Sequence, residues 1–214
     1  FYQVVRFAAP NIMVGNTILL KHASNVPQCA TAIEEIFEEA EAPKGLYTNL
    51  FISGKRASAL VSDKRIKGVS LTGSEKAGAS VATEAGKHLK KVVLELGGND
   101  VFIVLEDADM AKTVEWAVVG RMNNNGQSCI ASKRFIAVEA VADEFIHKFK
   151  DALSKLKVGD PMDPATQLGP LSSEEAAEHL ADQVNRSVEG GAKVLLGGKR
   201  LDREGAFMEP TILT

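Results

Sequence analysis

The sequence predicts an α/β fold with a parallel, doubly wound sheet, and three observations support this class. Short apolar segments such as 17–20 alternate with longer segments whose apolar residues recur at helical spacing, and the connections between them are short. Strands that are apolar along their whole length are typical of parallel sheets covered by helices on both faces. Repeated strand–helix–strand units favour the doubly wound arrangement.

The first half of the chain supplies most of these units. Strands are expected at about 17–20, 47–52, 66–71 and 92–96, and helices at about 1–14, 24–40, 55–62 and 74–88. Pro10 should bend the first helix or break it. Ser24 and Pro27 indicate the start of the second helix, as a cap residue and a first-turn proline. Cys29 lies on the apolar stripe of that helix, where we expect a packed core thiol.

Two glycines at 97 and 98 interrupt the apolar pattern and predict a boundary between two domains, 1–98 and 99–214. Beyond the boundary, strands are expected at about 101–105, 134–138 and 192–196, and helices at about 107–122, 140–155 and 173–189. A turn-rich linker at 159–170 precedes the last helix. Neither end carries an initiator methionine or a capping segment, so we expect a central piece with both domains incomplete.

Composition excludes several classes of function. The 214 residues are 45% hydrophobic and 25% charged, with a formal net charge of −3 and no basic run, which argues against nucleic acid and anionic membranes as partners. No apolar run approaches the ~20 residues of a membrane span. Two cysteines suit a reducing compartment and predict a cytoplasmic protein. The four histidines are scattered without metal-ligand spacing, so no metal site is expected.

Cys129 is the first candidate for chemistry. It follows Asn125-Gly126-Gln127-Ser128 in a polar loop, where a thiol has little core to fill. A thiolate is a strong nucleophile, and backbone amides in such a loop can hold an oxyanion after attack on a carbonyl. For this residue taken alone, an incidental surface cysteine is the alternative.

Glu95 is the second candidate. Its apolar neighbours predict a low-dielectric setting, which makes a carboxyl group a usable base at neutral pH. Gly97 and Gly98 follow and permit close approach of the backbone to a ligand. A glutamate that faces solvent and a pair of plain turn glycines are the alternatives.

Two further stretches suit an anionic ligand. Gly73 and Ser74 lie in the strand-to-helix junction 72–78, where helix amides can receive a phosphate, although this is not the Gly-x-Gly-x-x-Gly fingerprint. Lys21 and Ser24 follow the carboxyl end of another strand, the edge at which open α/β sheets bind ligands. Taken alone, these residues are equally well helix caps and a surface lysine.

Together these motifs resemble the aldehyde dehydrogenase superfamily. The matching stretches occur in the family's order and cover essentially the whole chain, at 15–21, 72–78, 94–98, 125–129 and 159–170. Stretches 21–24 and 96–100 look most like the bacterial succinate-semialdehyde dehydrogenase branch. The resemblance implies a Rossmann-like dinucleotide-binding domain over 1–98, followed by an α/β catalytic domain over 99–214.

The resemblance also implies roles for individual residues. Cys129 attacks the aldehyde to form a thiohemiacetal, whose oxyanion is held by the Cys129 amide and by an asparagine side chain from a motif that would end before Phe1. Hydride transfer to a nicotinamide leaves a thioester, and Glu95 activates the water that hydrolyses it. The cofactor-binding set is Lys21, Ser24, Gly73, Ser74, Gly78, Leu96 and Gly97.

Cofactor and substrate choice are hypotheses at this point. Ser24 stands where NAD-preferring relatives carry a glutamate that repels a 2′-phosphate, and Lys21 can pair with that phosphate, so we expect NADP or dual use of NADP and NAD. Relatives that bind succinate semialdehyde clamp its carboxylate with two arginines. Arg6 matches one of these positions, and Asn123 occupies the other, so a related short semialdehyde stays open as the substrate.

Other readings remain. An acylating or acyl-phosphate-reducing relative shares the cysteine but generally lacks the base at the position of Glu95. An inactive fragment or a cofactor-binding module is the non-enzyme alternative. The resemblance implies a small aldehyde as the partner and a homodimer or homotetramer as the assembly.

Overall fold

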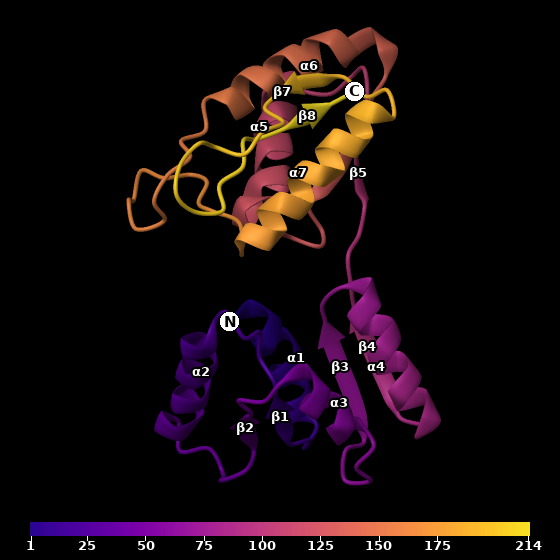
Figure 1. Cartoon of the computed structure of the whole chain (residues 1–214), viewed down its shortest axis with the longest axis vertical. Helices are drawn as coiled ribbons and strands as arrows, with labels where there is room; N and C mark the ends of the chain where they lie inside the picture. The colour runs from indigo at the N-terminus through magenta and orange to yellow at the C-terminus, as the bar shows by residue number, and fades with distance from the viewer. The chain divides into compact units, whose positions relative to one another are not determined.

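A computed structural model describes residues 1–214 and divides into two compact units, Phe1–Gly97 and Gly98–Thr214 (Figure 1). Gly98 falls in the second unit, whereas the glycine pattern placed it in the first. None of the helices combines the length and apolar character that crossing a membrane requires. No group of three or more His, Cys, Asp or Glu side chains is placed to hold a metal ion.

The first unit alternates helices and short parallel strands, as an α/β fold requires. Its elements are α1 (Tyr2–Met13), β1 (Ile18–Leu20), α2 (Pro27–Glu39), β2 (Tyr47–Asn49), α3 (Gly54–Val61), β3 (Gly68–Thr72), α4 (Glu75–Lys87) and β4 (Lys91–Glu95). Strand β1 pairs with β2 and β3 with β4, both in parallel. The hydrogen-bonded ladders are thus two-stranded pairs within the expected fold class, not one continuous sheet.

Two local expectations for this unit need correction, and a third is narrowed. Helix α1 runs unbroken through Pro10, so of the expected bend or break the break is absent. Helix α2 starts at Pro27 as expected, but its N-cap is Val26 and no side chain caps it, which leaves Ser24 outside the helix. Cys29 is half-buried, so it is only partly packed. The main core lies instead between α1, β1, α2 and β2, with Phe37 stacked on Tyr47 at 4.6 Å between ring centroids.

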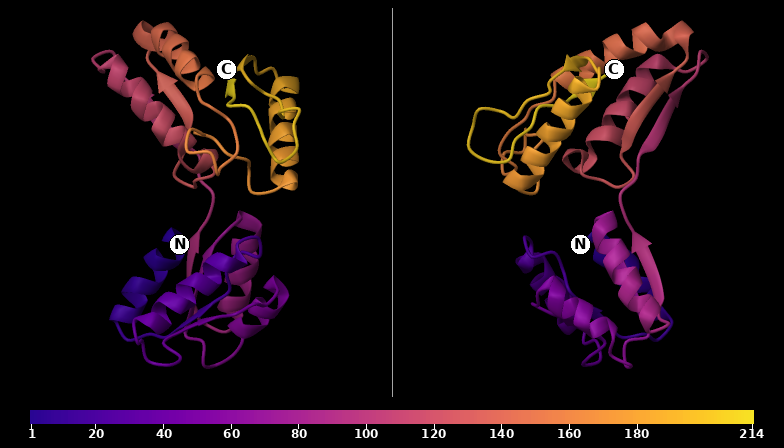
Figure 2. Two further views of the ribbon diagram at one scale, coloured as in Figure 1. Left: turned by 90° about the vertical axis from the view of Figure 1, so that its left-hand side faces the viewer. Right: turned by 45° about the vertical axis from the view of Figure 1, so that its right-hand side comes forward.

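The second unit holds β5 (Asp100–Val104), α5 (Met110–Met122), the 3₁₀ turn η1 (Asn123–Gly126), β6 (Ser132–Ala137), α6 (Glu139–Ser154), α7 (Glu174–Glu189), β7 (Val194–Leu196) and β8 (Ile212–Leu213). Strands β5 and β6 pair in parallel, and β7 and β8 form an antiparallel pair (Figure 2). The sequence pattern did not predict β8 or η1. Both elements are very short, so they carry almost no periodic signal.

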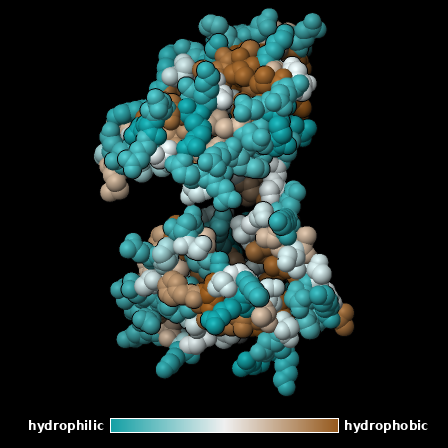
Figure 3. Space-filling model, in the orientation of Figure 1, coloured by the Kyte–Doolittle hydropathy of each residue, from teal (hydrophilic) through white to brown (hydrophobic).

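An aromatic cluster forms the core of this unit. Phe135 of β6 lies 4.8 Å from Phe149 of α6, and Phe145 lies 5.3 Å from Phe149, measured between ring centroids. A cavity of about 680 Å³ is lined by these rings together with Leu180 and Val184 of α7 and Ile212 of β8. Apolar surface on the visible face of this unit is bordered by polar side chains (Figure 3).

Candidate active site

The loop that carries Cys129 joins η1 to β6 and leaves the thiol exposed. Asn124, Asn125 and Gly126 precede it in the left-handed region, with φ of 53°, 56° and 73°. Only glycine adopts this region freely, and asparagine tolerates it better than most residues. Asn124, Asn125 and Gly126 therefore have a backbone reason: they reverse the chain tightly between α5 and Cys129.

Amide side chains attach this loop to the segment 169–172. Asn125 Oδ1 accepts a hydrogen bond from the Gly169 N–H at 2.8 Å, and its Nδ2 donates to the Pro170 carbonyl at 3.2 Å. Gln127 Oε1 accepts from the Ser172 N–H at 2.9 Å. Two stretches of the family resemblance, 125–129 and 159–170, are thus joined directly in space.

Two cationic side chains hold the loop from its ends. Arg121 on α5 donates from Nη1 to the Gly126 carbonyl at 2.9 Å, and its burial lowers the pKa of its guanidinium. Lys133 on β6 donates from Nζ to the carbonyls of Ser128, Cys129 and Ala131 at 3.2, 2.9 and 2.8 Å. The sequence reasoning missed Lys133, because its only signal was a lysine four positions after the cysteine.

The two glycines at the boundary, Gly97 and Gly98, differ in the space that a side chain would have. A Cβ added to Gly98 would lie 3.0 Å from the Cys129 carbonyl oxygen and 2.8 Å from Asp100 Oδ2, whereas one added to Gly97 would meet open space. Gly98 therefore allows the loop that carries Cys129 to approach closely within its own unit. Cys129 belongs to the second unit, and Glu95 to the first.

Glu95 ends β4 and pairs with Arg6 of α1, with 3.4 Å between Oε2 and Nη1. The two side chains keep 41% and 38% of their exposed area. The expectation of a low-dielectric setting for Glu95 is therefore wrong, because the carboxylate is partly solvated and faces a cation. The structure brings the expected base into contact with one arm of the expected substrate clamp.

The start of α4 matches what an anionic ligand needs. Ser74 is exposed and caps the helix, with Oγ accepting from the Ala77 N–H at 3.3 Å. The amides of Glu75 and Lys76 lie at the first two helix positions, where no intrahelical acceptor exists. Gly73, also exposed, donates its N–H to the Glu95 carbonyl at 3.0 Å, which fixes this junction beside the end of β4.

Gly78 packs against Leu96 in the interior of the first unit. A Cβ on this buried glycine would lie 2.8 Å from Leu96 Cδ2, so α4 approaches the end of β4 only because the side chain is absent. The structure gives both residues a packing contact that fixes the junction, and Gly97 beside them is exposed.

Lys21 and Ser24 follow β1 and are both exposed, and no carboxylate lies within ion-pair distance of Lys21. Burial lowers the pKa of the intervening His22, whose Nδ1 accepts a hydrogen bond from the Ala23 N–H at 2.7 Å. An uncommitted ammonium group beyond one parallel strand and two open helix amides beyond another fit the phosphates of a dinucleotide. Asn123, at the end of α5, is exposed and makes no side-chain hydrogen bond.

Comparison with known proteins gives consistent matches. A model of the aldehyde dehydrogenase family matches residues 1–214. The NADP-dependent succinate-semialdehyde dehydrogenase of Deinococcus radiodurans is 53% identical over 213 residues, covering 100% of this chain and 45% of that protein. A probable enzyme of the same name from Synechocystis is also 53% identical, with 47% of its length covered.

Solved structures agree with this match. The succinic semialdehyde dehydrogenase of Streptococcus pyogenes, solved in complex with NADP⁺, superimposes with a TM-score of 0.96 at 47% identity, over 100% of this chain and 47% of that one. The chain therefore spans about half the length of the relatives it matches.

Proposed function

Because this chain belongs to the aldehyde dehydrogenase family, we propose that the protein oxidises succinate semialdehyde to the carboxylic acid, with NADP as the hydride acceptor. One observation carries the proposal: Cys129 is exposed, and its backbone N–H has no acceptor within the chain. The relatives from D. radiodurans and S. pyogenes support the substrate and the cofactor. We further propose that the protein is cytoplasmic, in keeping with its two free thiols. We also propose that it assembles as a homodimer or homotetramer.

In this mechanism the Cys129 sulfur attacks the aldehyde carbon, and the carbonyl oxygen becomes an oxyanion. The Cys129 N–H is free to donate to that oxygen. Stabilisation of a developing oxyanion by such fixed donors is usually the largest single contribution to catalysis. The exposed loop lets the aldehyde approach without displacing a packed side chain. NADP, when bound, supplies the acceptor for the hydride that leaves the same carbon.

Glu95 is the proposed base for the second half of the reaction. Its carboxylate accepts a proton from a water molecule, whose oxygen attacks the thioester carbon and releases the acid and the Cys129 thiolate. Arg6 contacts this carboxylate at 3.4 Å and thereby restricts its orientation. In this proposal Arg6 either positions Glu95 or binds the substrate carboxylate together with the exposed Asn123, and the ion pair favours the positioning role.

The proposed cofactor site lies in the first unit. Lys21 and Ser24 would hold the ribose phosphate, and the exposed junction of Gly73 and Ser74 would receive the pyrophosphate at the start of α4. The packed pair of Gly78 and Leu96 fixes the angle of that helix, with Gly97 next to it.

A steady-state assay of the full-length protein tests the proposal. Purified protein is supplied with succinate semialdehyde and either NADP or NAD, without coenzyme A or phosphate, and both reduced cofactor and free acid are measured. We expect acid formation with NADP, and loss of at least about 10³-fold in kcat for Cys129→Ala with cofactor binding retained. Turnover that requires coenzyme A or phosphate would instead indicate an acylating or phosphorylating relative, and turnover in Cys129→Ala would exclude the nucleophile.

A further inference from the structure

Lys133 contacts the backbone of the loop that carries Cys129, here called the nucleophile loop, at three residues. Its ammonium group carries three N–H donors, and the structure gives it three acceptors, the carbonyls of Ser128, Cys129 and Ala131. The side chain is half-buried, and no carboxylate lies within ion-pair distance of it. A cation whose donors are all directed to backbone carbonyls has little left for a role in solubility or in a surface ion pair.

These contacts determine where the amides of the loop point. All peptide bonds in the chain are trans, and in a planar trans peptide the carbonyl of one residue and the N–H of the next point in opposite directions. The Ser128 carbonyl faces Lys133, so the Cys129 N–H faces away from it. The Cys129 carbonyl also faces Lys133, so the Ile130 N–H is directed away as well.

Neither amide donates a hydrogen bond within the chain. Two free N–H groups are therefore directed away from Lys133 at the residue that carries the reactive sulfur. Donors that are already aimed at the position of an oxyanion before the reaction stabilise it most strongly, because nothing has to reorganise.

We propose that Lys133 is a positioning residue for the reaction of Cys129: it holds the carbonyls of the loop on one side and so aims the Cys129 and Ile130 amides at the oxyanion. This inference rests on the proposed function of Cys129 as a nucleophile. It adds a residue that touches neither the aldehyde nor the cofactor.

The test separates attack at a carbonyl from simple reactivity of the thiol. Hydrolysis of a nitrophenyl ester without cofactor passes through an oxyanion, whereas alkylation of Cys129 by iodoacetamide does not. Loss of one oxyanion donor lowers kcat by about 10²- to 10³-fold, so we expect Lys133→Met to lower kcat for ester hydrolysis and aldehyde oxidation by roughly 10-fold or more. The alkylation rate should stay within about twofold of wild type, and Lys133→Arg, which keeps donors, should recover part of the loss.

Several controls make the outcome decisive. Lys148→Met removes an exposed lysine of the same unit that pairs only with Glu144 and should leave both rates unchanged. If Lys133→Met does not fold, Lys133→Gln and Lys133→Arg carry the same comparison, with the melting temperature measured for each. An unchanged kcat in Lys133→Met, or alkylation slowed in parallel with it, would overturn the inference. A wild-type protein that hydrolyses the ester but oxidises no aldehyde would refute the proposed function and leave the Lys133 comparison intact.

Discussion

At the scale of single residues, polar side chains that bind the backbone shape the nucleophile loop. Asn125 uses both ends of its amide on the segment 169–172, and Arg121 and Lys133 use their donors on the loop's own carbonyls. Side chains of this kind satisfy backbone groups that a tight reversal leaves without ladder partners. The position of Cys129 therefore depends on neighbouring side chains that bind the backbone of its loop.

Asn125 offers a test of this view, because it combines a φ of 56° with two hydrogen bonds. Asn125→Ala loses both bonds, at about 0.5–1.5 kcal/mol each. Alanine also lacks the polar side chain that lets asparagine tolerate the left-handed region, which costs other residues roughly 1–2 kcal/mol. Asn125→Gly loses only the bonds. We expect urea unfolding to show Asn125→Ala less stable than Asn125→Gly by about 1 kcal/mol.

The matched control is Asn123→Ala, at an exposed position with a φ of −52°. Its free energy of unfolding should stay within about 0.5 kcal/mol of wild type. Equal destabilisation by Asn125→Ala and Asn125→Gly would show that the left-handed backbone is not what asparagine supplies there.

At the scale of elements, most helices and strands were predictable from the sequence, and the contacts between them were not. The start of α4 at Ser74 and that of α5 at Asp109 follow from cap residues that the sequence displays. The pairing of Arg6 with Glu95 joins α1 to β4, and no local pattern reports a contact across so many residues. Cys129 and Glu95 were predictable as candidates, whereas Lys133 required the geometry of its three acceptors.

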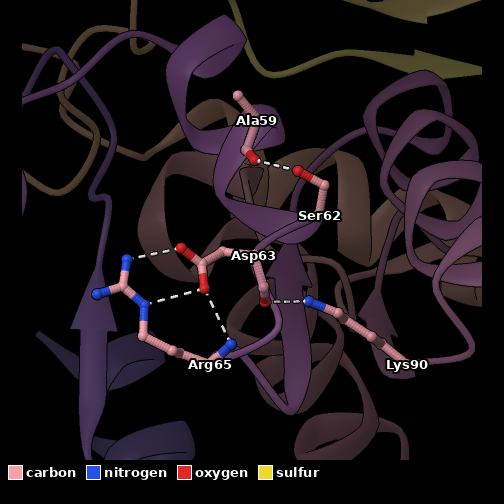
Figure 4. Close-up of polar contacts among 5 residues, drawn as sticks. All are labelled: Ala59, Ser62, Asp63, Arg65 and Lys90. Carbon is pink, nitrogen blue, oxygen red and sulfur yellow. Dashed lines mark hydrogen bonds and ion pairs between the residues drawn. The ribbon is translucent and has the colours of Figure 1, made fainter.

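A polar junction ties the turn after α3 to the residue before β4. Asp63 accepts hydrogen bonds from the Arg65 amide and guanidinium at 2.7–3.0 Å, and Lys90 donates to the Asp63 carbonyl (Figure 4). Hydrogen bonds from Arg65 hold the pKa of the Asp63 carboxyl well below its usual range. The junction lies at the end of the strand pair opposite to Glu95.

The lowered pKa of Asp63 predicts that part of the stability of the fold is lost at acidic pH. Because the folded pKa lies below the unfolded value of about 3.9, ionised Asp63 stabilises the fold above that pH and loses the effect as the pH falls through the folded pKa. Asp63→Asn should therefore melt below wild type at neutral pH, and the difference should narrow as the pH is lowered from about 6 to about 2.5. Thermal melts across this series measure it, and a difference independent of pH would count against the role of the carboxylate.

At the scale of the whole molecule, the proposed reaction draws on both units. Glu95 and the phosphate-binding candidates belong to the first unit, and Cys129 with its supporting side chains belongs to the second. The chain spans 45–47% of the length of its curated relatives, so the activity is tested on the full-length protein. The assay of the full-length protein also tests the choice of substrate. Arg6 is already paired with Glu95, and Asn123 carries no positive charge, so neither is a free cation for the substrate carboxylate.

Cofactor choice is the property of the whole protein that the first unit lets us predict. Ser24 and Lys21 are exposed beyond β1, and no acidic side chain pairs with that lysine. A glutamate at position 24 would set a carboxylate against the 2′-phosphate of NADP and offer a counter-ion to Lys21. We expect Ser24→Glu in the full-length protein to raise KM for NADP by about tenfold or more, which corresponds to about 1.4 kcal/mol, with a smaller effect on KM for NAD.

Two further variants serve as controls. Ser24→Ala, which adds no charge, should keep the cofactor preference of wild type, and Lys21→Met should weaken the binding of NADP more than that of NAD. If Ser24→Glu raised both KM values equally, the loop after β1 would not read the phosphate, and cofactor choice would have to be sought elsewhere in the protein.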